Sequence, residues 1–153
     1  MFQSFFPQPK LFFSSLAIWS GFLILVWYSF GKTIGEALGF DLAEPETVIG
    51  LGHFITSEFL WFDAFFAFGA LVFFFVWRAR SPHEWQIWSV LGSALLIYLS
   101  YASVQVSVVI NAWYGPFYND IQTALTGDGG ITASDLYGHF LVFCTIAFPY
   151  ILF

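Results

Sequence analysis

The chain contains continuous apolar runs of about twenty residues, and this feature limits its fold more than any other. Backbone amides cannot remain unpaired in hydrocarbon, so a run of this length crosses a membrane either as a helix or as a strand of a closed barrel. Barrel strands alternate apolar and polar residues over roughly ten positions, whereas these runs are continuous. We therefore expect an all-α, polytopic membrane protein with about four transmembrane helices in this chain.

The composition agrees with lipid as the solvent, because 59% of the residues are hydrophobic and only 9% are charged. A soluble chain of this size would have too little polar surface. The four Lys and Arg residues form no basic patch interleaved with stacking aromatics, so nucleic acid is excluded as a partner. The single cysteine, Cys144, lies in an apolar run and cannot form an internal disulfide.

The first two spans are expected to form an N-terminal hairpin over residues 1–80. They cover about 11–30 and 59–77 and are joined by an acidic loop that faces outward. Within this loop, residues 48–55 could form a short helix that lies flat on the membrane. The second span ends at Arg78-Ala79-Arg80-Ser81-Pro82, where two guanidinium groups stop insertion and the proline breaks the helix.

Residues 81–153 are expected to begin the transmembrane core, with spans at about 85–112 and 136–153 and a second acidic loop at 113–135. The third span is long for one crossing at roughly 1.5 Å per residue, so it should tilt or project beyond the bilayer. The fourth span reaches Phe153 without a stop-transfer charge or a polar tail. We therefore expect the chain to be truncated there.

Basic residues set the expected orientation, because Lys and Arg in short loops stay on the cytoplasmic side. Lys10 and the Arg78/Arg80 pair fall on one side of the membrane, and both acidic loops fall on the other with Lys32 as the exception. The pattern predicts a cytoplasmic N-terminus and two acidic connectors that face outward.

The sequence contains no pattern of an enzyme or of a metal site. His53, His83 and His139 lie in different segments without the spacing of metal ligands, and each is expected to be an interfacial or loop residue. The GxGxxG, GxSxG, HExxH and Walker A patterns are absent. We therefore expect no catalytic residues, no metal and no cofactor.

Asp63 is the candidate for an intramembrane acid. An acid inside an apolar span is costly and often functional, as in a proton relay. Asp63 lies near the outer end of its span, however, and a carboxylate about one turn below the interface can also reach water. Both interpretations stay open.

Small and polar side chains follow one side of the third span. At ~100° per residue they fall within an arc of roughly 80°: Ser89, Ser93, Ser100, Ser103, Ser107 and Asn111. Such a stripe either allows another helix to approach closely or faces a water-filled cavity. Gln105 and Tyr98 lie on the opposite side, which is typical of a helix enclosed by protein.

Two longer runs resemble a known family. They read SPHEWQIWS at residues 81–89 and NAWYGPFYNDIQTAL at residues 111–125, and the opening MFQSFFP at residues 1–7 is similar as well. These motifs resemble the SbmA/BacA-like family of bacterial inner-membrane peptide transporters. The resemblance covers essentially the whole chain, which is well under half of a typical family member.

The resemblance implies a homodimer with the transmembrane fold of ABC exporters, lacking its own ATPase domain. Such a protein imports peptides and peptide-like antibiotics across the inner membrane and is driven by the proton gradient. Residues before about 80 would then be an extra hairpin, and the third and fourth spans would be the first pair of the core. The lipid bilayer and the peptide substrate are the implied partners, and the glutamates thought to couple protons lie beyond this fragment.

The family motif would form the outer end of a core helix, with these residues: Asn111, Trp113, Tyr114, Phe117, Tyr118 and Gln122. Its aromatic residues suit headgroup depth, so the segment is either an interfacial anchor and helix cap or, through Asn111 and Gln122, part of the dimer contact or the outer gate. The chain departs from the family in having Asn119 where an acid is usual, with Asp120 following. This departure puts a specific role for the acid in doubt.

Two other interpretations remain open. The chain could be the transmembrane domain of an ATP-driven ABC transporter whose nucleotide-binding domain is missing, or a small accessory membrane protein that ends naturally at Phe153. A Walker A motif in the downstream sequence would distinguish the first from the proton-driven transporter.

Overall fold

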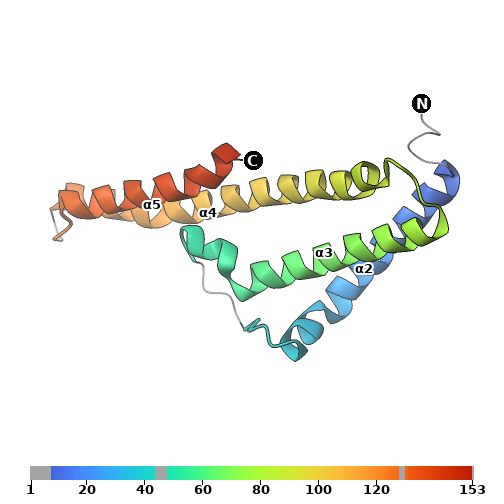
Figure 1. The fold of residues 1–153 in the computed structure, drawn as a ribbon. Coiled ribbons are helices and arrows are strands. Elements are labelled where there is room, and N and C mark those ends of the chain that lie inside the picture. Colours follow the sequence, from blue (N-terminus) through green and yellow to red (C-terminus); the bar gives the residue numbers. More distant parts are fainter. Residues whose placement is uncertain (1–7, 44–47, 128–129, 153) are drawn as a thin grey trace. The chain divides into compact units, whose positions relative to one another are not determined.

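The structure, a computed structural model, describes residues 8–43, 48–127 and 130–152, and the described chain is helical without any strand (Figure 1). Its elements are α2 (Pro9–Ala37), the 3₁₀ helix η1 (Leu51–Ile55), α3 (Ser57–Arg80), the π-helix η2 (Ile87–Gly92), α4 (Ser93–Thr126) and α5 (Ala133–Leu152). The all-α prediction is therefore confirmed. The opening motif at 1–7, residues 44–47, the pair 128–129 and Phe153 lie outside the described residues.

Three helices are long and apolar enough to cross a membrane, namely Pro9–Ala37, Ser57–Arg80 and Ile87–Thr126, and the apolar stretch Ala133–Phe148 is shorter. The third contains 40 residues and extends over about 60 Å, roughly twice the hydrocarbon thickness. This helix is longer than the predicted span of about 85–112, and its tilt or projection beyond the bilayer stays a prediction. The fold is that of an all-α, polytopic membrane protein.

The predicted connectors are shorter in the structure. The prediction of an acidic loop at 113–135 is wrong, because α4 continues through Thr126 despite Pro116. A proline removes one backbone hydrogen bond from a helix. The contact between Phe117 and Phe140 of α5 supports the helix beyond this point. The first span likewise extends to Ala37 rather than to residue 30.

The second span ends as predicted, at Arg80 and just before Pro82. The short helix proposed for 48–55 is present as η1, and its placement on the membrane stays a prediction.

The chain divides into two compact units. The first comprises residues 1–44 and 57–97, and the second comprises 45–56 and 98–153, so the boundary falls inside α4. This structural division differs from the functional one predicted near residue 80, which stays a prediction.

In the first unit, α2 and α3 form an antiparallel hairpin (Figure 1). Three indole N–H groups each donate a hydrogen bond to the facing helix. The bonds join Trp19 to the Gly69 carbonyl, Trp61 to the Gly31 carbonyl and Trp77 to Ser15 Oγ, each at 3.0 Å. Gly35 permits the close approach, because a Cβ there would lie 2.9 Å from Trp61 Nε1. Lipid tails are as apolar as the side chains, so hydrogen bonds and small residues hold such helices together.

Candidate functional site

In the second unit, α5 packs against one face of α4 through a small apolar core. Val106, Val109 and Trp113 of α4 are buried together with Ile146 of α5. The Trp113 ring stacks on Phe117 at a centroid distance of 4.5 Å. This core fixes the level at which the two helices face each other.

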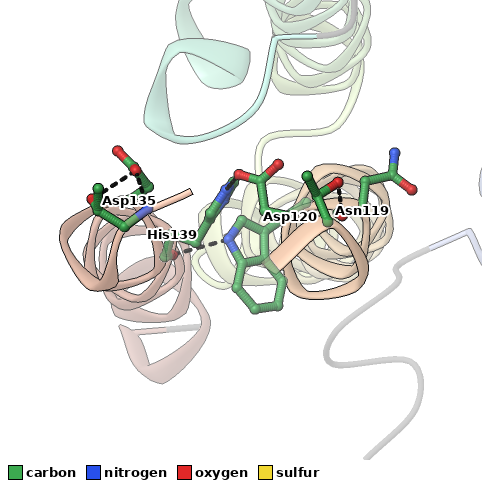
Figure 2. Close-up of polar contacts among 7 residues, drawn as sticks. Asn119, Asp120, Asp135 and His139 are labelled. Carbon is green, nitrogen blue, oxygen red and sulfur yellow. Dashed lines mark hydrogen bonds and ion pairs between the residues drawn. The ribbon is translucent and has the colours of Figure 1, made fainter. Parts of the chain in front are cut away.

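Two polar contacts with His139 of α5 extend this packing. The indole N–H of Trp113 donates to the His139 backbone carbonyl at 3.0 Å. The His139 Nε2 lies 2.8 Å from the Asp120 Oδ2, and the two side chains meet between the helices (Figure 2). Because a carboxylate only accepts, Nε2 carries the hydrogen and donates it. His139 is therefore bonded to α4 through both its backbone and its side chain.

The His139–Asp120 pair is neither fully exposed nor fully buried. The side chains of His139 and Asp120 retain 20% and 31% of their accessible surface, and the Phe117 ring packs edge-on against the His139 ring. A histidine–carboxylate pair with one side open to solvent can exchange protons with water while its charges interact more strongly than on an open surface.

The first turn of α5 carries a second acid with a separate role. The backbone N–H and the hydroxyl of Thr132 both donate to Asp135 Oδ2, at 2.8 and 2.7 Å. This is a variant of the capping box, in which the third helical residue reaches back to the cap. These two bonds lower the pKa of the Asp135 carboxyl, and the nearby His139 lowers it further.

The motif departure at positions 119 and 120 has a structural outcome. Figure 2 shows Asn119 pointing away from α5, whereas Asp120 reaches toward His139. One residue along a helix rotates the side chain by about 100°. The acid at 120 therefore lies on the α5-facing side of α4.

The family motif spreads over two faces of α4. Trp113 is only 4% exposed and packs against α5, and Phe117 lies partly buried beside it. The other motif residues are exposed: Asn111, Tyr114, Tyr118 and Gln122. Tyr114 and Tyr118 stack on each other at 5.8 Å. No cap forms at this point, because the helix continues to Thr126, and the gate and dimer roles stay predictions.

The serine stripe lies on the side of α4 away from its buried residues. Ser93, Ser100 and Ser107 are exposed and Ser103 is partly buried. Ser89 lies in η2, whose wider π turn departs from the ~100° step used to place it. The choice between a helix-packing surface and a cavity lining stays open.

Other predicted residues lie elsewhere. Asp63 is partly buried on α3, in the first unit. His53 of η1 contacts Gln105 Oε1 of α4 at 3.0 Å through its Nε2. Within the described ranges, no group of three or more His, Cys, Asp or Glu residues could hold a metal ion.

Sequence reasoning missed the His139–Asp120 pair because it placed both residues in or beside a long loop. A usable signal was present. Asp120 lies nine residues before Gly129 and His139 nine residues after Gly130, and Trp113 and Ile146 are each sixteen residues from the same pair. In an antiparallel helical hairpin with a turn at these glycines, residues equally distant from the turn face each other.

Comparison with protein-family models shows what this region is similar to. Residues 82–153 match the SbmA/BacA-like family, and this stretch contains nearly all of the first motif run and the whole of the second. The matched residues include η2, α4 and α5. The resemblance carried by the two motifs is confirmed over this part of the chain, which is similar to the SbmA/BacA-like family.

Proposed function

We propose that the chain is part of a transporter that imports peptides and peptide-like antibiotics across the bacterial inner membrane, as a homodimer driven by the proton gradient. The observation that carries the proposal is the family match over residues 82–153, which include the helix Ile87–Thr126, long and apolar enough to cross a membrane. The same match supports the more general conclusion that this is a membrane protein of a peptide transporter family.

The two faces of α4 support a role in a transport path. One face is buried against α5, and the other exposes serine hydroxyls, the Asn111 amide and the Gln122 amide. A polar helix face is costly against lipid, so in the membrane it requires protein or water as its neighbour. A water-filled peptide path or a second protomer supplies that neighbour.

The proposed orientation has a cytoplasmic N-terminus. The hydrogen bond between Trp77 and Ser15 brings the start of α2 and the end of α3 together, so Lys10 and the Arg78/Arg80 pair share one end of the hairpin. Basic residues gathered at one end favour the cytoplasmic side. On this orientation, α4 leads outward and its turn with α5 faces the periplasm.

Transport can be tested with the full-length protein that contains this chain, reconstituted in liposomes. We expect a labelled peptide to accumulate when the outside is more acidic, and a protonophore to abolish this accumulation. Accumulation that ignores the gradient and requires ATP would instead favour the ATP-driven alternative. Equal labelling of protein-free liposomes would reject transport altogether.

The homodimer is tested separately by the mass of the purified protein in a mild detergent. We expect two copies per particle. A particle with one copy that still transports would reject the dimer and leave the transport proposal intact.

A further inference from the structure

We infer that His139 and Asp120 together form a further proton-binding site that couples proton entry to peptide import, in addition to the glutamates that the family resemblance places beyond this fragment. This inference rests on the proposed proton-driven transport and assigns residues of this chain to it. Figure 2 shows the two side chains meeting between α4 and α5.

The position of the pair meets two requirements of a coupling site. Protons must reach it, and the side chains of His139 and Asp120 retain 20% and 31% of their accessible surface. Its charge must also act on the protein, and its two members belong to different helices. Imidazole is the side chain suited to taking up and releasing protons near neutral pH.

The proton balance is simple. With Nε2–H donated to the Asp120 carboxylate, an incoming proton binds to Nδ1 of His139 and converts the neutral ring into an imidazolium ion. The Asp120 carboxylate, 2.8 Å from Nε2, then faces a full positive charge. Release of the proton from Nδ1 restores the hydrogen bond from a neutral imidazole to the carboxylate, and no other reactant is consumed.

The protonation state of His139 can act on the helix pair because the residue is bonded to α4 twice. Its carbonyl accepts from Trp113, and the Trp113 ring is part of the core shared by α4 and α5. Protonation adds a positive charge to the donor side of a bond whose acceptor is already a carboxylate, so the two partners attract each other as an ion pair. Proton binding therefore tightens the α4–α5 hairpin at its outer end, and release loosens it.

Few other charged groups compete for this role among the described residues of the second unit. Asp120 faces His139 from α4, and Asp135 interacts with it electrostatically from the first turn of α5. Asp135 is already engaged by Thr132. On the η1 side, His53 contacts Gln105, which lies fifteen residues before Asp120 on α4.

The test uses His139→Gln in the full-length transporter, because a glutamine amide can still donate to Asp120 but cannot take up a proton. Two measurements distinguish a role in proton coupling from a structural role. One is accumulation of labelled peptide driven by an acidic exterior, and the other is exchange of labelled for unlabelled peptide without a gradient. We expect accumulation to fall to the level of protein-free liposomes and exchange to persist.

Three further variants complete the test. Asp120→Asn should behave as His139→Gln does, whereas Asp120→Glu, which keeps the carboxylate, should restore accumulation. His53→Gln is the matched control, because it alters another histidine bonded to α4, and it should leave accumulation dependent on the gradient.

The outcomes distinguish this inference from the proposed function. If the wild type accumulates peptide with the gradient and His139→Gln does so equally, the inference is overturned and the proposed function stands. Loss of both accumulation and exchange in a correctly folded His139→Gln protein would also overturn it, because the residue would then have a structural role. A wild type that ignores the gradient would reject proton-driven transport itself.

Discussion

In both the α2–α3 and the α4–α5 hairpin, a tryptophan indole N–H donates a hydrogen bond that joins the two helices. The acceptor residues and their neighbours differ between the two hairpins. In the first, the indoles of Trp19 and Trp61 donate to glycine carbonyls, where the absence of a side chain allows close approach. In the second, the Trp113 indole donates to the carbonyl of His139, whose own side chain bonds Asp120. The second hairpin thus adds a titratable contact to a neutral one.

This difference indicates a division of labour. Bonds from an indole to a backbone carbonyl do not change with protonation, so the α2–α3 hairpin should keep one geometry across the working pH range. A histidine–carboxylate contact does change. We therefore expect the α2–α3 hairpin to serve as a fixed anchor and the end of α4–α5 that holds His139 and Asp120 to respond to protons.

The largest predicted effect concerns the buried core of the second hairpin. Trp113→Ala removes a ring that is 4% exposed and stacked on Phe117, together with its hydrogen bond to His139. We expect a loss of about 3–5 kcal/mol in the free energy of unfolding, measured as thermal or denaturant stability of the purified protein in detergent.

The neighbouring Tyr114 supplies the control, because it lies on the exposed face of the same helix at 42% exposure. Tyr114→Ala should cost no more than about 1 kcal/mol. Equal losses from the two variants would contradict the assignment of buried and exposed faces to α4.

A smaller effect is predicted where the first hairpin depends on close approach. A Cβ at Gly35 would lie 2.6 Å from Leu42 Cδ1 and 2.9 Å from Trp61 Nε1. Overpacking costs about 1–3 kcal/mol, which exceeds the ~1 kcal/mol that alanine gains over glycine in a helix. Gly35→Ala should therefore lower the melting temperature.

Gly21→Ala is the matched substitution in the same helix, since a Cβ at Gly21 meets nothing within 4 Å. We expect it to stabilise the protein by up to about 1 kcal/mol through helix propensity alone. If both alanines raised the melting temperature, close packing at Gly35 would not hold α2 against α3.

Much of the fold follows from the apolar runs, and the errors have specific causes. The end of the second span at Arg80 follows from two charges and a proline, which act locally on the chain. The extension of α4 through Pro116 and of α2 to Ala37 depends on contacts with another helix, as between Phe117 and Phe140 or between Trp61 and Gly31. Residues that interrupt helices locally, such as proline and glycine, give no information about such contacts between helices.

The candidate site could be predicted only in part. The motif identified the segment 111–122, but the motif alone does not distinguish the buried face of Trp113 from the exposed face of Tyr114. The His139–Asp120 contact requires the hairpin register, which can be worked out from the sequence once α4 is known to extend to Thr126. The predicted loop at 113–135 concealed that register.

The smallest predicted effect concerns the pH dependence of the α5 start. Asp135 precedes the apolar run of this helix, and the two donors of Thr132 hold its pKa below the ordinary value. Because the folded state has the lower pKa, the stabilisation is complete above the unfolded value near about pH 4 and is lost as the pH falls through the folded value. Amides in the first turn of α5 should therefore exchange hydrogen faster, relative to the intrinsic rate, in acid.

Asp135→Asn should remove this pH dependence, and the variant and the wild type should converge at low pH, where the wild-type carboxyl is protonated. Thr132→Val removes the hydroxyl donor and leaves the backbone donor, so its effect should be intermediate. The start of α2 carries no acid in its first turn and serves as an internal reference. A gap between wild type and Asp135→Asn that persisted unchanged in acid would contradict the carboxylate cap, because a neutral side chain would then account for the protection equally well.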